Sequence, residues 1–323
     1  MGPGVGDPKD TRSARDAVAE RHGRWAAANI HLGDGVYTLD HGHVGTLEFM
    51  VHSVTQSVAD LASKPLSDLR VLDLACGEGA YAIELGLHGA TVVGVEGRPS
   101  NGAKARFAAQ ELGLENVQII DGDVREISEE KLGRFDVVLC LGILYHLEAE
   151  AAVRLLGQCY ALCDQFVVIR TAIGLAPDFH ERIGPHSYRG RRAPEDVQQG
   201  HAALDTPTAI LPTKSSLLNV LSDVGFSSVV ELRNPSVPGL DDFIDTTTLI
   251  AARGQALPYR SIPALDILLP ELRRRERRGP SWVWRVAAPQ QGPYWRLRER
   301  VFHTVRRTLW QSHHPIESWR VRR

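Results

Sequence analysis

Val71-Leu-Asp-Leu-Ala-Cys-Gly-Glu-Gly79 is the stretch of sequence that decides the fold. An apolar run that ends in a turn of small residues is typical of a buried parallel strand whose carboxyl end meets a ligand. Gly77 and Gly79 lack the Cβ atoms that would keep a ligand away from the backbone. The next residues, 80–88, read as a helix, whose first free N–H groups would point at the same ligand.

The full G-x-G-x-x-G run of dinucleotide folds is absent, because Ala75 stands where its first glycine would be. Three more apolar strands are expected at residues 91–96, 117–123 and 135–147, in the order and spacing of a doubly wound sheet. Helices are expected at 101–112 and 149–162. Ligands of open α/β sheets bind beyond the carboxyl ends of the strands, so the residues at these ends should share one rim.

The stretch from Val71 to Gly79 resembles motif I of class I S-adenosylmethionine-dependent methyltransferases, in which the turn holds the methionine end of the cofactor. The resemblance implies an α/β fold with a Rossmann-like seven-stranded methyltransferase sheet, completed by strands at 165–170, 228–231 and 246–251. It also implies an N-terminal lid. The cap insertion after strand 5 and the helical C-terminal extension are expected from this chain itself, from the length of the insertion and from the helical periodicity of residues 294–309. The cofactor-binding set is then Asp73, Ala75, Cys76, Gly77, Gly79, Glu96, Asp123, Val124, Leu141 and Gly142.

Within this set the acidic residues have different expected roles. Glu96, at a strand end, should accept hydrogen bonds from the ribose hydroxyls rather than serve as an ordinary solvated residue. Asp123 should take the adenine amino group, with Asp121 capping the loop. Asp73 either shapes the glycine turn or touches the cofactor. Asp136 is expected to bond a neighbouring backbone N–H only.

Gly142-Ile-Leu-Tyr-His-Leu147 and the run 211–226 resemble the tRNA uridine-34 carboxymethyltransferases and their methyltransferase relatives, over about residues 25–252. The segment before motif I is shorter than in the true carboxymethyltransferases, and they lack the Arg/Trp-rich tail found here. Methyl transfer therefore remains the expectation, whereas the carboxymethyl donor and the tRNA substrate do not follow from the resemblance.

Two residues after the fourth strand are the catalytic candidates. A sulfonium methyl is already activated, so an enzyme must align the acceptor and, for a hydroxyl, supply a base. His146 is either that base or a structural histidine, and Tyr145 is either a wall of the substrate site or a packing residue. His31 and Tyr37 could reach the same site from the lid. His41 and His43 lack a third ligand, so no metal site is predicted.

The insertion at 171–213 is expected to determine which acceptor molecule the protein binds, because loops this long usually serve as lids or binding elements. Its Arg189, Arg191 and Arg192 could bind an anionic acceptor or could be ordinary surface charge. The Asn-Pro-Pro-Tyr motif of amino-directed DNA methylation and the Pro-Cys nucleophile of cytosine-C5 methylation are both absent from the sequence. Base methylation by those routes is therefore not expected.

Charge divides the chain of 323 residues unevenly. The net charge is −2, yet residues 271–323 hold fourteen Arg and four Glu together with five of the six Trp.

The expected parts are a helical lid segment at 1–60, a methyltransferase domain at 61–255 and a basic extension at 256–323. The extension could contact RNA or the surface of a membrane, or dock on the acidic body or a second subunit. Four cysteines without a disulfide pattern, and no secretory signal, favour the cytoplasm.

These observations predict a methyltransferase that uses S-adenosylmethionine on a small molecule, by O-methylation of a sugar, a lipid-linked glycan or a secondary metabolite. The alternatives are a tRNA-modifying enzyme that grips RNA with its tail, and a catalytically silent cofactor-binding protein whose tail recruits a membrane or a partner.

Overall fold

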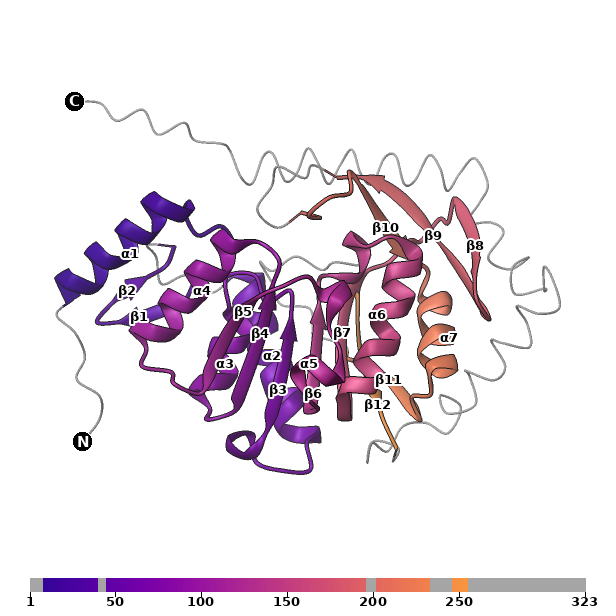
Figure 1. Ribbon diagram of the computed structural model, residues 1–323, viewed down its shortest axis with the longest axis horizontal. Helices are drawn as coiled ribbons and strands as arrows, with labels where there is room; N and C mark the ends of the chain where they lie inside the picture. Colours follow the sequence, from indigo (N-terminus) through magenta and orange to yellow (C-terminus); the bar gives the residue numbers. More distant parts are fainter. Residues whose placement is uncertain (1–7, 40–44, 196–201, 233–245, 255–323) are drawn as a thin grey trace. The chain divides into compact units, whose positions relative to one another are not determined.

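The centre of the computed structural model is a seven-stranded sheet with the strand order β11-β12-β7-β6-β3-β4-β5 (Figure 1). The structure describes residues 8–39, 45–195, 202–232 and 246–254, which all belong to one unit, Met1–Asp266. The strands of the sheet are β3 (Arg70–Leu74), β4 (Thr91–Glu96), β5 (Val117–Asp121), β6 (Phe135–Leu141), β7 (Cys163–Ala172), β11 (Ser228–Leu232) and β12 (Thr246–Ala252). The predicted seven-stranded sheet is thus confirmed.

Strand β3 lies inside the sheet and pairs in parallel with β4 and β6, while β12 runs antiparallel to both β7 and β11. Val71, Leu72 and Leu74 of β3 are fully buried. Parallel strands covered on both faces need such continuous apolar runs. The parallel strands β3, β4, β5 and β6 direct their carboxyl ends to one edge, which carries the glycine turn.

Helices cover both faces of the sheet. One face packs on α2 (Thr46–Leu61), α3 (Ala80–Leu87) and α4 (Pro99–Glu111), and the other on α6 (Ala149–Leu162) and α7 (Lys214–Val224). Shorter elements connect them: η1 (Leu66–Asp68), η2 (Val124–Glu126), α5 (Glu129–Leu132) and η3 (Leu144–His146). Asp136 accepts the expected bond from a backbone N–H, that of Arg70 at 2.9 Å, but it also accepts bonds from the side chains of Lys64 at 2.7 Å and Gln165 at 3.0 Å.

The N-terminal segment begins with a helix. Helix α1 spans Pro8–His22, within the segment 1–60 that the sequence predicts to be helical. The helix is followed by Gly23 with φ of 83°, and the backbone N–H groups of residues 26–28 then donate to Glu78 instead of continuing a helix. Thr11 of α1 bonds Glu111 of α4 at 2.5 Å, so α1 is docked on the domain. A short hairpin, β1 (His31–Gly33) and β2 (Val36–Tyr37), follows.

The expected cap insertion after the fifth strand is present as a separate antiparallel sheet with the order β10-β9-β8. Its strands are β8 (Phe179–Ile183), β9 (His186–Pro194) and β10 (Thr208–Pro212), and it packs against α6 and α7 through the buried side chains of Phe179, Tyr188 and Ile210. The basic extension at 256–323 lies outside the described residues. Among the described residues, no helix is both long and apolar enough to cross a bilayer.

Candidate functional site

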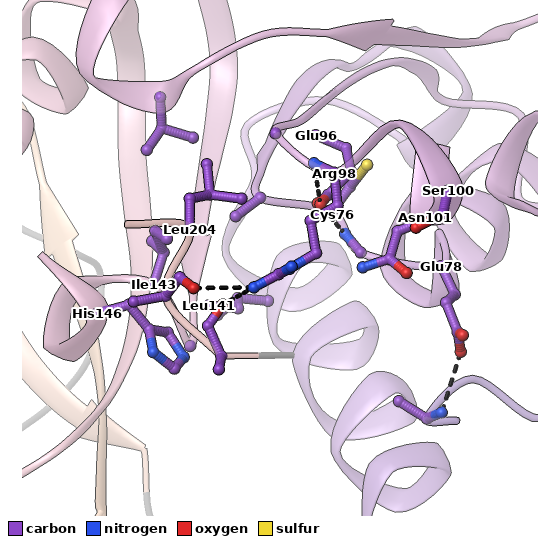
Figure 2. A pocket seen from close by; sticks show the side chains of 18 of the residues that line it. Cys76, Glu78, Glu96, Arg98, Ser100, Asn101, Leu141, Ile143, His146 and Leu204 are labelled. Atoms are coloured by element: carbon purple, nitrogen blue, oxygen red, sulfur yellow. Dashed lines mark hydrogen bonds between the residues drawn. The ribbon is translucent and has the colours of Figure 1, made fainter. Parts of the chain in front are cut away.

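A cavity of about 510 Å³ lies at the carboxyl ends of β3, β4 and β6. All the predicted cofactor-binding residues except Gly79 line it, and so do both catalytic candidates, Tyr145 and His146. Figure 2 shows Glu96, Cys76, Glu78 and Asn101 on one side of the cavity and Leu141, Ile143, His146 and Leu204 on the other. The residues that the sequence placed on one rim therefore meet around one cavity.

The turn after β3 has the strained backbone that its small residues suggested. Ala75, Gly77 and Gly79 all have positive φ angles, of 53°, 57° and 89°. For alanine this left-handed conformation costs roughly 1–2 kcal/mol. Gly79 does not line the cavity: a Cβ there would lie 2.9 Å from the Cβ of Ala105, so its role is to let α3 pack on α4. Its predicted contact with the cofactor stays a prediction.

Glu96 closes the cavity at the end of β4 and is 5% exposed. One carboxylate oxygen accepts a hydrogen bond of 2.8 Å from the backbone N–H of Gly77, and the other accepts one of 2.9 Å from that of Arg98. Glu96 is thus not a solvated strand-end residue. Each oxygen keeps a further lone pair, so the carboxylate can accept bonds from a ligand's hydroxyl groups as well.

Asp73 is buried beneath the turn, with an exposure of 1%. Its Oδ2 atom is buried and has no hydrogen-bond partner among the described residues. Burial, followed by the negative charge of Glu96, raises the pKa of this carboxyl group to about 8. A buried polar atom without a partner is costly, and a cationic ligand group in the cavity would provide one.

The rim after β5 holds Asp123 and Val124, which both line the cavity. The carboxylate of Asp123 accepts bonds from the backbone and guanidinium of Arg125, which lower its pKa. Arg125 also contacts Asp205 of the cap insertion at 2.8 Å. Asp121 points elsewhere and bonds Arg106 at 3.1 Å. Asp123 therefore lines the cavity and Asp121 does not, while the adenine contact of Asp123 stays a prediction.

Glu78, within the turn, holds the N-terminal segment and was missed by the sequence analysis. Its carboxylate accepts bonds of 2.9, 3.0 and 2.9 Å from the backbone N–H groups of Ala26, Ala27 and Ala28, as well as a bond of 2.8 Å from Lys104. The Glu78 and Lys104 side chains are 5% and 6% exposed. Residues 26–28 of the segment predicted as a lid are therefore held against the turn and line the cavity. The only signal in the sequence was an acidic residue between the two glycines.

His146 lies in η3, directly after β6, and its side chain is 8% exposed. Its Nδ1 atom lies 2.5 Å from Oε1 of Glu195, which follows β9 in the cap insertion and is 12% exposed. The ring of Tyr145 lies 4.0 Å from the imidazole, centroid to centroid. Burial raises the pKa of Tyr145, so this phenol stays neutral near pH 7 and cannot serve as a base. Sequence reasoning missed Glu195, which lies far from His146 along the chain.

The cap insertion also contacts the rim of the cavity. Arg98 donates hydrogen bonds of 3.0 and 2.8 Å to the backbone oxygens of Ala202 and Ala203, and its side chain reaches across the cavity in Figure 2. Leu204 lies against Gly97, where an added Cβ would approach the leucine to 2.6 Å. We call Ala202–Asp205, held by Arg98 and Arg125, the cap latch.

The residues predicted to bind substrate lie away from this cavity. His31 and Tyr37 stack on each other at 4.6 Å in the β1–β2 hairpin. Arg192 pairs with Glu181 at 2.8 Å and lies over the ring of Phe179. The predicted set of His31, Tyr37, Arg189, Arg191 and Arg192 contributes no residue to the cavity lining. The residues of the cap that line the cavity are Ala202–Asp205, so substrate binding by these five residues stays a prediction.

His41 and His43 lie outside the described residues. Within the described ranges, no group of three or more His, Cys, Asp or Glu side chains could hold a metal ion. Cys76 packs on the sheet at the edge of the cavity, and burial raises its pKa well above the ordinary value for a thiol. It remains a protonated thiol, which is not a nucleophile at neutral pH.

Comparison with known proteins agrees with this geometry. Residues 71–165 match the family model described as a methyltransferase domain. The ubiquinone biosynthesis O-methyltransferase of Acinetobacter baumannii (strain AYE) is 31% identical over 88 residues, which are 27% of this chain and 37% of that protein. The protein of the same name from Paracidovorax citrulli (strain AAC00-1) is 35% identical over 89 residues, or 28% and 37% of the two chains. The matches thus span little more than a third of these relatives.

Among solved structures, the N-terminal domain of EvdMO1 with SAH bound has a TM-score of 0.60 at 20% identity, covering 79% of this chain and 100% of that one. The same domain in the presence of SAH and D-fucose has a TM-score of 0.59 at 21% identity, covering 76% and 97%. At such identities the likeness shows the fold alone. Together with the strand order, this likeness shows a Rossmann-like methyltransferase fold, and residues 71–165 are the part that resembles the methyltransferase-domain family.

Proposed function

We propose that this chain transfers a methyl group from S-adenosylmethionine to a hydroxyl group of a small molecule. The observation that carries the proposal is the cavity itself. Its strained turn, Asp73 and Glu96 lie at the carboxyl edge of the sheet, and a buried histidine lies across from them. One end thus suits a charged nucleoside cofactor, and the other offers a base.

The residues present fit S-adenosylmethionine. The unpartnered Oδ2 of Asp73 suits the ammonium group of the methionine part, and the remaining lone pairs of Glu96 suit the ribose hydroxyls. Asp123 and Val124 lie where the resemblance puts the adenine. The EvdMO1 domain, crystallised with the demethylated product S-adenosylhomocysteine (SAH), supports the same choice of cofactor.

When bound, the cofactor supplies a methyl group attached to a sulfonium sulfur. This methyl group is activated toward nucleophiles, because the electrons of the C–S bond stay on the sulfur, which becomes neutral. This chain must then align the acceptor, exclude water and remove one proton. His146 is the residue that accepts the proton as the new C–O bond forms. Tyr145 stays neutral and can donate a hydrogen bond to the acceptor. The apolar side chains of Leu47, Ile143 and Leu147 complete this part of the lining.

The charges of the lining favour a neutral acceptor over an anion. Three of the four Arg and Lys side chains that line the described part of the cavity already have protein partners: Arg98 bonds the cap latch, Lys104 bonds Glu78, and Arg125 bonds Asp123 and Asp205. The fourth is Arg24. The curated relatives are named O-methyltransferases, which supports oxygen as the acceptor atom. A sugar, a lipid-linked glycan or a secondary metabolite fits this description.

The proposal is tested by incubating the chain with methyl-labelled S-adenosylmethionine and an extract of its host, then separating RNA, organic-soluble compounds and small solutes. We expect label in the organic or small-solute fraction. Label that nuclease releases from RNA would instead establish the tRNA-modifying alternative. Binding of SAH without transfer of labelled methyl into any fraction would indicate a cofactor-binding protein that has no catalytic activity.

Asp73 gives the proposal a pH signature. Because its pKa of about 8 exceeds the ordinary value of 3.8, the folded state keeps a proton that the unfolded state loses. The stabilisation that comes from this bound proton, measured as free energy of unfolding, is therefore complete below about pH 4 and is lost as the pH rises toward 8.

An ammonium group beside Asp73 favours the carboxylate, so SAH binding near pH 7 should release much of one proton. Calorimetry in phosphate and in Tris buffers measures this release as a difference in apparent enthalpy. Asp73→Asn should abolish the difference. An enthalpy that is the same in both buffers for the wild type would show that Asp73 does not meet the ammonium group.

Glu96→Gln should weaken SAH binding by about 10- to 100-fold, since hydrogen bonds to a charged group contribute roughly 1.5–3 kcal/mol. The matched control is Asp121→Asn, because Asp121 pairs in register with Glu96 but binds Arg106 outside the cavity. Equilibrium dialysis of labelled SAH measures both affinities. Equal losses in the two variants would remove Glu96 from the cofactor site.

A further inference from the structure

We propose that Glu195 of the cap insertion is a positioning residue that fixes the tautomer of His146 and orients its ring. The proposal rests on the proposed function, because it assigns His146 the role of base. It extends that function to the cap, which then takes part in the reaction by delivering a carboxylate to the catalytic histidine.

The contact between the two side chains carries the argument. Nδ1 of His146 lies 2.5 Å from Oε1 of Glu195, and the two side chains are only 8% and 12% exposed. The two atoms are close but are not aligned as a hydrogen bond in the structure. A negative charge this near to Nδ1 nevertheless favours the neutral tautomer that carries its proton on Nδ1, with the lone pair on Nε2. The negative charge also stabilises the imidazolium that forms when His146 takes a proton from the acceptor. Both effects are stronger in a site that excludes water.

The position of Glu195 is fixed by the cap on both sides of the contact. Its backbone N–H donates a bond of 2.8 Å to the backbone oxygen of Pro207, and strand β9, which ends at Pro194, is paired with β10. Strand β10 in turn packs against η3, the element that carries His146. The cap latch then ties the same insertion to Arg98 and Arg125. The carboxylate is therefore held by paired backbone rather than by a free surface loop.

An ordinary structural ion pair is the competing explanation, and the location argues against it. Both His146 and the latch residues Leu204 and Asp205 line the cavity, so the contact belongs to the wall where an acceptor would lie. The ion pair between Glu181 and Arg192, also in the cap, differs in this respect. Glu181 and Arg192, at 44% and 50% exposure, contact each other outside the cavity. Glu181→Gln is accordingly a matched control that removes one charge from the same small sheet.

The test combines a spectroscopic and a kinetic measurement on the full chain. Nitrogen-15 NMR of the histidine rings at alkaline pH, with His146 assigned from the His146→Gln variant, reports which ring nitrogen carries the proton. We expect Nδ1–H in the wild type and in Glu181→Gln. In Glu195→Ala a population with Nε2–H should appear. Glu195→Gln keeps an acceptor oxygen and should retain the tautomer, which covers the case in which the alanine variant fails to fold.

The kinetic measurement is the rate at which labelled methyl is transferred at saturating S-adenosylmethionine. It is made in the fraction that the wild type labels. Both Glu195 variants should lose roughly 10- to 100-fold in kcat, part of the 10²- to 10⁴-fold that a general base contributes, with SAH affinity unchanged. A loss of kcat in Glu195→Ala with the tautomer unchanged, or an altered tautomer with full kcat, would overturn the proposal. A wild type that binds no SAH would instead refute the proposed function, whereas the NMR result does not depend on the cofactor.

Discussion

His146→Ala is expected to lower the rate of methyl transfer by about 10²- to 10⁴-fold, the usual contribution of a general base. The reason is that His146 is the buried basic side chain across the cavity from Glu96, while its neighbour Tyr145 is held neutral by burial. The affinity for SAH should change little, because the cofactor contacts lie at the other end. Single-turnover transfer of labelled methyl into the acceptor fraction measures the loss.

Tyr145→Phe is the companion variant, since it removes a polar group from the same wall without removing the base. It should reduce transfer far less than His146→Ala. If the histidine variant kept its full rate while still binding SAH, His146 would be a structural residue, which was the alternative that the sequence left open.

Glu78→Ala is expected to lower the free energy of unfolding by about 3–5 kcal/mol, the usual cost of removing one partner from a buried ion pair. The change leaves the buried Lys104 ammonium without its carboxylate and frees three backbone N–H groups in residues 26–28. Thermal unfolding should shift down by roughly 10 °C for a domain of this size. Chemical denaturation measures the free energy directly.

The comparison variant is Glu129→Ala, because Glu129 is half exposed and lies 3.6 Å from Arg134 at the surface. Its loss should leave stability almost unchanged. Lys104→Met combined with Glu78→Leu should recover part of the loss, since an apolar pair avoids the buried charge. If Glu78→Ala were as stable as the wild type, the segment before β1 would not depend on this carboxylate.

The sheet could be predicted from sequence because each strand carries its own signal. Buried parallel strands need apolar runs, and the residues at their ends, such as Glu96 and Gly77, follow those runs directly. The rule that ligands bind at the carboxyl ends of such strands therefore sufficed to predict that Asp73, Glu96, Asp123 and His146 share one cavity. What the sequence could not decide was the competing role of each residue, since burial and partners depend on the folded chain.

The pairings across the site could not be predicted. Glu195 meets His146 only because the cap folds into a three-stranded sheet whose β10 lies on η3, and no local pattern encodes that packing. The same holds for Glu78, which accepts from an N-terminal segment about fifty residues earlier. The arginines of β9 looked like anion ligands by residue type, yet the sheet directs Arg192 toward Glu181. The Arg/Trp-rich extension lies outside the described residues, so its predicted role stays a prediction.

Equilibrium dialysis of labelled SAH against the purified chain tests the cofactor site most directly. We expect saturable binding of one SAH per chain, with a dissociation constant below about 1 mM, the upper end of ordinary KM values. Binding should also weaken in Glu96→Gln and persist in His146→Ala. If the folded wild type showed no saturable binding, the cavity at the end of β3 would not be a cofactor site.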